Sequence, residues 1–145
     1  MIRAFIDASV LIAASYSPTG ASREIIRQAI RGKVALVASK LVLEETTENL
    51  RAKAPEALVY LQQLLGVVPF ELVQPTKLQV SRAASYTALK DAPIVAAAKR
   101  ARVDYLVSLD RRHLVGVPEV AQRSGLKIVL PEELLEEIRR QADYD

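Results

Sequence analysis

Four acidic side chains stand at positions where a metal-dependent chemistry would need them: Asp7, Glu45, Asp91 and Asp110. Asp7 and Asp110 each follow the last apolar residue of a predicted strand. If these strands are parallel neighbours, both carboxylates lie at the carboxyl edge of one sheet, where ligand sites form in open α/β sheets. The alternative for either residue is a loop acid that only caps the next helix.

Glu45 has to be distinguished from Glu44 and Glu48 in the same predicted helix. At about 100° per residue, residues 41–43 and Leu50 define one apolar arc, which includes Glu45, whereas Glu44 points nearly the opposite way. An acid on a buried face is unfavourable unless it is paired, hydrogen-bonded or bound to a cation. We therefore expect Glu45 in the site, and Glu44 and Glu48 in solvent.

Asp91 shares a helical face with Ile94, Val95 and Ala98, which follow it at three, four and seven residues. It also stands where an N-cap would stand, because Pro93 suits the first turn of the helix. The two roles are compatible, and the pattern leaves both open.

Carboxylates gathered in one pocket cannot all stay ionised without a counter-charge. Mg²⁺ and Mn²⁺ prefer carboxylate and water oxygens, and a chain with no Cys and one His is poorly suited to zinc. Such a metal can lower the pKa of a bound water, align it with a phosphodiester and stabilise the leaving oxygen. One bound ion could perform these tasks, or two ions could share them.

The elements that must position these acids alternate between strand and helix, which predicts a parallel sheet covered on both faces. Expected strands are the run ending at Asp7, then 34–38, 67–73, 105–109 and 126–130. Expected helices are 8–15, 22–31, 40–52 after the cap Ser39, 55–65 with Gly66 as its stop, 76–88 with a Thr76/Gln79 capping box, one from Asp91, and one from Pro131. The expected buried stripe of the helix from Pro55 consists of Leu58, Leu61, Leu64 and Leu65. Pro69 predicts that the strand 67–73 is irregular or lies at an edge of the sheet. The fold class is therefore α/β, a three-layer α/β/α sandwich with four to five parallel strands.

Composition and charge limit the kind of protein. With 145 residues, half of them apolar, the chain fits one domain spanning 1–145. The formal charge is +3, so gathering four acids in a pocket leaves a basic surface suited to a polyanion; the alternative is an ordinary solvated surface. The first apolar stretch is interrupted at Asp7, and no window approaches the roughly 18 apolar residues of a membrane span. We expect a cytoplasmic protein without membrane contact.

Four segments carry a family resemblance: Phe-Ile-Asp7-Ala-Ser9-Val-Leu, Leu43-Glu-Glu45-Thr-Thr-Glu-Asn-Leu50, Lys-Asp91-Ala-Pro-Ile-Val-Ala-Ala-Ala and Asp104-Tyr-Leu-Val-Ser108-Leu-Asp110. In order, they resemble the acidic motifs of the PIN domain family, which includes VapC-type toxins and related ribonucleases. The resemblance implies a Mg²⁺- or Mn²⁺-dependent endoribonuclease whose pocket is built from the four acids. It also implies that Ser9 and Ser108 support the metal shell. An antitoxin partner and a homodimer are further expectations.

Basic residues flank the predicted pocket in sequence and are expected to hold the RNA backbone: Lys40, Arg82, Lys90, Lys99, Arg111 and Arg112. His113 is expected to be a surface residue, since a metal mechanism needs no histidine base. Two alternatives remain open. One is a PIN-like module that binds RNA or protein with little turnover. The other is a receiver-like domain, which would require a lysine near the end of the last strand, where this chain has Ile128-Val-Leu-Pro131.

Overall fold

A computed structural model describes residues 1–144 and contains a five-stranded sheet. The strands are β1 (Arg3–Ile6), β2 (Ala35–Ala38), β3 (Glu71–Leu72), β4 (Tyr105–Val107) and β5 (Ile128–Val129). Their order across the sheet is β3-β2-β1-β4-β5, and every neighbouring pair is parallel. The predicted parallel sheet is confirmed.

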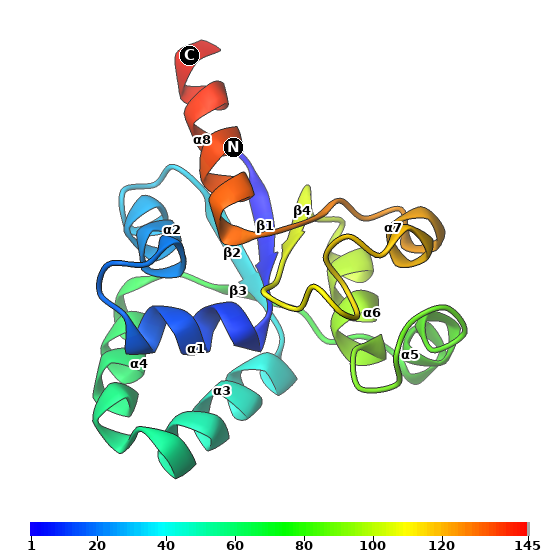
Figure 1. The fold of residues 1–145 in the computed structure, drawn as a ribbon, viewed down its shortest axis with the longest axis horizontal. Coiled ribbons are helices and arrows are strands. Elements are labelled where there is room, and N and C mark those ends of the chain that lie inside the picture. The colour runs from blue at the N-terminus through cyan, green and yellow to red at the C-terminus, as the bar shows by residue number, and fades with distance from the viewer. Residues whose placement is uncertain (145) are drawn as a thin grey trace.

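Helices cover both faces of this sheet. They are α1 (Ala8–Tyr16), α2 (Ala21–Ile30), α3 (Lys40–Lys53), α4 (Pro55–Val67), α5 (Lys77–Ala83), α6 (Ala92–Ala101), α7 (Pro118–Ser124) and α8 (Pro131–Tyr144). Helices α1 to α4 lie on one side of the strands and α5 to α7 on the other, while α8 packs on α2 and β4 (Figure 1). None of the helices in residues 1–144 has the length and apolar composition that a membrane crossing requires.

The central strand β1 positions the site. Its Ala4, Phe5 and Ile6 have no exposed surface, as expected for a strand with a helix layer on each face. Strand order reverses beside β1, since β2 lies on one side of it and β4 on the other. In parallel sheets such a reversal opens a crevice at the carboxyl ends of the two strands. Ile6 pairs with Val107 in register, so the residues that follow the two strands emerge together.

The edge of the sheet differs from the prediction. Strand 67–73 shrinks to β3, because α4 continues through Gly66 to Val67 and ends where Val68 N donates to Leu64 O at 2.9 Å. Gly66 is therefore not a stop. The expectation that Pro69 marks an edge is confirmed, because β3 is the outermost strand.

The buried face of α4 is also narrower than predicted. Leu61 and Leu64 are buried, but Leu58 is only partly buried and Leu65 is 37% exposed. Ala57 completes the buried face, one turn before Leu61. The stripe thus lies closer to Ala57 than the four leucines indicated.

The chain after β3 combines one confirmed element with one that was not predicted. The capping box is present, with Gln79 N donating to Thr76 Oγ1 at 3.1 Å and Thr76 N donating to Gln79 Oε1 at 2.9 Å. Helix α5 nevertheless ends at Ala83 rather than near 88, because the following residues form turns. The unpredicted helix is α7, although its signals are in the sequence: Pro118 opens it, and Gly125 ends it with φ of 75°.

Candidate active site

Asp7 lies just beyond β1 and is held by three hydrogen bonds. Its Oδ1 accepts from Ala8 N at 2.7 Å, and its Oδ2 accepts from Ser108 Oγ at 2.7 Å and from Ser9 Oγ at 3.3 Å. Asp7 is therefore the N-cap of α1 as well as a pocket acid. Burial raises the pKa of Asp7, the three hydrogen bonds oppose this shift, and the nearby charge of Asp110 adds to it.

Asp110 lies three residues past β4, in a turn, rather than directly after a strand reaching 109. Its Oδ1 accepts from Arg112 N and His113 N, both at 3.0 Å, which fixes the carboxylate. Asp110 N donates to Ser108 Oγ at 3.0 Å, and that hydroxyl in turn donates to Asp7. Ser108 thus joins the two acids, which lie at the same edge of the sheet as predicted.

Ser9 makes a parallel connection between the same two segments. Its Oγ donates to Asp7 Oδ2 and accepts from Leu109 N at 3.1 Å. Ser9 and Ser108 therefore orient Asp7 and hold the start of the turn that carries Asp110. Their role in a metal shell stays a prediction.

Asp91 does not cap α6 through its side chain, so this part of the prediction is wrong. The residue has φ −96° and ψ −12°, and its carboxylate makes no capping hydrogen bond. The first-turn donors are otherwise satisfied: Ala92 N donates to Ala88 O, Pro93 has no N–H, and Ile94 N donates to the Asp91 carbonyl. No donor is left for the carboxylate, which therefore turns into the pocket.

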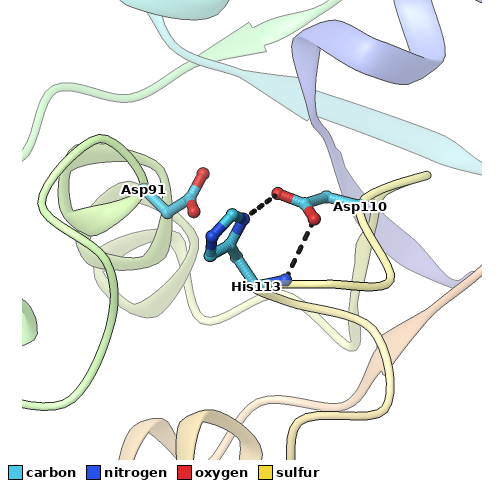
Figure 2. Close-up of side chains that lie close together, drawn as sticks. All are labelled: Asp91, Asp110 and His113. Carbon is cyan, nitrogen blue, oxygen red and sulfur yellow. Dashed lines mark hydrogen bonds and ion pairs between the residues drawn. The ribbon is translucent and has the colours of Figure 1, made fainter.

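Asp91, Asp110 and His113 converge, as Figure 2 shows. Each offers one ligand atom, and these atoms all lie within 4.8 Å of one another. Asp91 Oδ2 is buried and has no hydrogen-bond partner among residues 1–144. His113 Nδ1 lies 3.3 Å from Asp110 Oδ2.

The expectation that His113 is an ordinary surface residue is therefore wrong: it is half-buried and part of the cluster. The turn that lets His113 N donate to Asp110 Oδ1 also brings the imidazole back to the same acid. The only signal in the sequence was the three-residue spacing from Asp110, which does not specify this turn.

Glu45 lies at the rim of the pocket. It is exposed, whereas the buried face of α3 is formed by Val42, Thr46 and Leu50, so the predicted buried position is wrong. Even so, partial loss of solvent, followed by the charges of Asp7 and Asp91, raises the pKa of Glu45.

Its neighbour Glu44 is exposed and lies 3.9 Å from Lys40 in an ion pair on the solvent side of α3. Glu48 is exposed as well. The prediction that Glu44 and Glu48 are solvated is confirmed.

The other two acids are perturbed in opposite directions. Burial raises the pKa of Asp91, the charge of Lys90 opposes this, and Asp110 and Asp7 add to it. Partial burial acts to raise the pKa of Asp110, but the hydrogen bonds from His113 and the Lys90 charge bring it below its ordinary value. Lys90 Nζ lies 3.7 Å from Asp110 Oδ2. A cation therefore already neutralises part of the pocket.

The six predicted RNA-contacting residues separate into three groups. Lys90, Arg111 and Arg112 are exposed and lie beside Asp91 or Asp110. Lys40 pairs with Glu44. Arg82 and Lys99 line a different cavity between α5 and α6.

This donor set fits a hard divalent cation. Carboxylate oxygens predominate, one imidazole is in reach, and the buried Asp91 Oδ2 has no hydrogen-bond partner in the described part of the chain. Mg²⁺ and Mn²⁺ prefer such oxygen ligands, and Mn²⁺ also accepts imidazole. Asp91, Asp110 and His113 are the residues that could hold an ion, with Asp7 fixed beside them through Ser108.

A model of the PIN domain family matches residues 3–112, a range that contains all four acids. The chain belongs to the PIN domain family. Membership rules out the receiver-like alternative. A search of curated proteins finds no match for this PIN domain.

Solved structures resemble this PIN domain in fold at low sequence identity. PAE2754 from Pyrobaculum aerophilum is 19% identical with a TM-score of 0.65, covering 96% of this chain and 90% of that one. VapBC2 from Rickettsia felis, bound to a DNA fragment from its promoter, is 11% identical with a TM-score of 0.64, covering 89% and 98%. VapC20 from Mycobacterium tuberculosis, described as a sarcin-ricin loop cleaving toxin, is 18% identical with a TM-score of 0.52, covering 71% and 86%. The α/β PIN-like fold is thus shared with toxins of the VapC type.

Proposed function

We propose that this PIN domain protein is a Mg²⁺- or Mn²⁺-dependent endoribonuclease that hydrolyses RNA phosphodiester bonds. One observation carries the proposal: a buried Asp91 carboxylate oxygen, without a hydrogen-bond partner in residues 1–144, lies in a cluster with Asp110 and His113. A buried acid without a donor is unfavourable in the isolated protein, so its presence favours a cation as the missing partner.

The residues of the acidic pocket are proposed to have different roles in the reaction. Asp7, Asp91 and Asp110 are proposed as catalytic metal ligands, with Glu45 reaching in from the rim. Ser9 and Ser108 fix the Asp7 carboxylate through hydrogen bonds to Oδ2. A bound cation would neutralise the pocket and activate water for attack on the phosphodiester.

The basic residues next to the pocket are proposed to receive the RNA backbone. Lys90 holds an ammonium 3.7 Å from Asp110, so it can neutralise phosphate charge at that edge. Arg111 and Arg112 are exposed in the turn that carries Asp110. Lys40 is the weakest of the set, because Glu44 already pairs with it.

The substrate and partner proposals draw on the structural relatives. VapC20 is described as cleaving the sarcin-ricin loop, which supports RNA as the substrate class. VapBC2 is a complex of two components, which supports a toxin role with an antitoxin protein as partner. We also propose a homodimer and a single nuclease domain over residues 1–145.

Cleavage-site mapping on total cellular RNA tests this function. The wild-type protein with Mn²⁺ should cut RNA at defined positions, and EDTA should abolish the cuts. The control is Asp7→Asn, which keeps the size of the side chain but removes one charge from the pocket. It should cut at least a hundredfold more slowly, since a metal ligand is weakened.

The competing function is a PIN-like module that binds RNA or a protein with little turnover. It predicts RNA binding in EDTA and no metal-dependent cuts in any preparation. Equal cutting by wild type and Asp7→Asn would instead indicate a contaminating nuclease and contradict the proposal.

A further inference from the structure

A second feature lies between α5 and α6, away from the acids. It is a cavity of about 390 Å³ lined by Arg82, Lys99, Arg100, Arg102, Gln79 and Tyr86, among others. None of the residues described by the structure that line it is acidic. In the described part of the chain, none of its four cationic side chains belongs to an ion pair. We refer to it below as the basic cavity.

Four like charges around one cavity repel one another, and among residues 1–144 no ion pair compensates them. Some exposed cations elsewhere on this molecule pair with acids, as Arg27 does with Glu24 and Arg140 with Glu137; the basic cavity differs in that four cations gather around it. An uncompensated cluster of this kind raises the local concentration of anions and is the electrostatic pattern of a phosphate-binding surface.

A neighbouring cavity shares one lining residue with the basic cavity and another with the acidic cluster. It has a volume of about 350 Å³, and its lining includes Tyr86, Thr87, Arg112 and His113. Tyr86 also lines the basic cavity, and His113 belongs to the acidic cluster. The elements involved, α5 to α7, lie on the same side of the sheet (Figure 1). The two shared residues thus define a path from Asp110 to the basic cavity.

The length of α6 sets the distance between the acidic pocket and the basic cavity. Asp91 directly precedes this helix and Lys99 follows eight residues later, which corresponds to about 12 Å along the axis at 1.5 Å per residue. A single phosphate group cannot contact both places. A strand of several nucleotides can, and each of its phosphates carries a negative charge.

We propose that an RNA strand whose scissile phosphate lies at the acids runs past His113 and Tyr86 and places another backbone phosphate in the basic cavity. This inference rests on the proposed function and specifies how the substrate is held. Backbone contacts position a nucleic acid without reading its sequence. The basic cavity therefore contributes affinity and register, and the cleavage sequence is read elsewhere.

Binding measured in EDTA tests the path independently of catalysis. The variant is Arg82→Gln/Lys99→Gln, and the charge-matched control is Lys33→Gln/Lys53→Gln, whose exposed lysines lie outside both cavities. For single-stranded RNA of about twenty nucleotides, the cavity variant should bind roughly tenfold more weakly. Its slope of log affinity against log salt should fall by about 0.7, since the one phosphate held in the cavity contributes about 0.7 for a single strand. The control should keep the wild-type slope.

Cleavage of two substrates with Mn²⁺ distinguishes the path from the proposed function. The cavity variant should raise the KM of the long RNA at unchanged kcat, and should cleave a trinucleotide like wild type, because that substrate cannot reach the cavity. If neither wild type nor the cavity variant cleaves RNA, but the salt slope of RNA affinity in EDTA is still lower for the variant, the endoribonuclease proposal fails. The inference that the basic cavity binds RNA is then retained. An unchanged slope and affinity in a variant that melts like wild type overturns the inference. So does full competition by a mononucleotide at the concentration that saturates the cavity, since that indicates a small-anion site.

Discussion

Asp7 and Asp91 are both buried acids of one pocket, yet their surroundings differ. Asp7 accepts three hydrogen bonds, so its carboxylate is fixed in place before any ligand arrives. Asp91 has an oxygen without any donor in residues 1–144, and its pKa is raised chiefly by burial. Of the two acids, Asp91 is therefore the one whose carboxylate gains most from a bound cation.

Replacing Asp91 by Asn separates a metal ligand from a structural acid. Because the folded-state pKa of Asp91 is raised, its stabilising contribution is fully present below the ordinary value of 3.8 and is lost as the pH rises from there through the raised value. At neutral pH the charge is unfavourable, so Asp91→Asn should stabilise the metal-free protein by about 1 kcal/mol in urea unfolding. RNA turnover should fall by orders of magnitude, whereas RNA affinity in EDTA should stay equal or improve.

The glutamates of α3 provide the matched comparison for that experiment. Glu44→Gln should leave the cleavage rate near wild type, because Glu44 is exposed and pairs with Lys40. Glu45→Gln should reduce the rate, because Glu45 interacts with Asp7 and Asp91. An active Glu45→Gln beside an inactive Glu44→Gln would reverse the assignment, and a fully active Asp91→Asn would end the four-carboxylate mechanism.

Among the elements, α6 holds Asp91 against the sheet through small residues. Ala96, Ala97 and Ala98 are at most 2% exposed, and α6 packs on both α5 and β2. Close approach of the helix to the strands depends on these side chains, because a packed interior does not accept extra methylene groups without shifts. The position of Asp91 is thus a property of the whole helix.

Enlarging one of these alanines should disturb the site from a distance. Ala98→Leu should destabilise the fold by about 1–3 kcal/mol through overpacking, and should displace α6 enough to lower RNA turnover. Ala52→Leu, at an exposed position of α3, is the control and should change stability by less than about 0.5 kcal/mol. Urea unfolding and cleavage rate report the two effects. Equal stability in the two variants would show that the packing of α6 is looser than its burial indicates.

Local sequence signals predicted where most elements begin. They did not predict the features that tertiary contacts determine, such as where strands end. Ser39, Thr76 and Pro131 open helices as expected, because caps and proline act within one turn. Strand ends were predicted too long, since sheet pairing rather than the apolar run sets them; β4 stops at Val107 although Leu109 follows. The same limit hid the cluster contact of His113, which depends on a turn beyond β4.

At the scale of the whole molecule, topology creates the pocket. Asp7 and Asp110 are distant in sequence, but β1 and β4 are neighbours, and the serines at positions 9 and 108 connect the two chain segments. The sequence predicted that both acids lie at one edge. It could not predict the strand order, which is set by pairing between segments distant in the chain, or the basic cavity, which depends on how α5 and α6 pack together.

The metal should therefore stabilise the whole fold, and the effect should depend on pH. The raised pKa values of Asp7, Glu45 and Asp91 mean that the metal-free protein loses stability as the pH rises through them, while Asp110, with its lowered pKa, acts in the opposite direction below its ordinary value of 3.8. As the pH rises these acids lose their protons, and the carboxylates then bind a cation in place of a proton.

Mn²⁺ at about a hundred times its Kd should then add about 2.7 kcal/mol, which corresponds to a rise in Tm of roughly 5–10 °C for a chain of this size. Near pH 4.5, the ordinary value for Glu45, protons compete with the metal, so the rise should shrink. Asp7→Asn should lose most of the rise at neutral pH, and Glu44→Gln should keep it. Differential scanning calorimetry at both pH values measures this, and a wild-type Tm that millimolar Mn²⁺ leaves unchanged at neutral pH would contradict a preformed metal site.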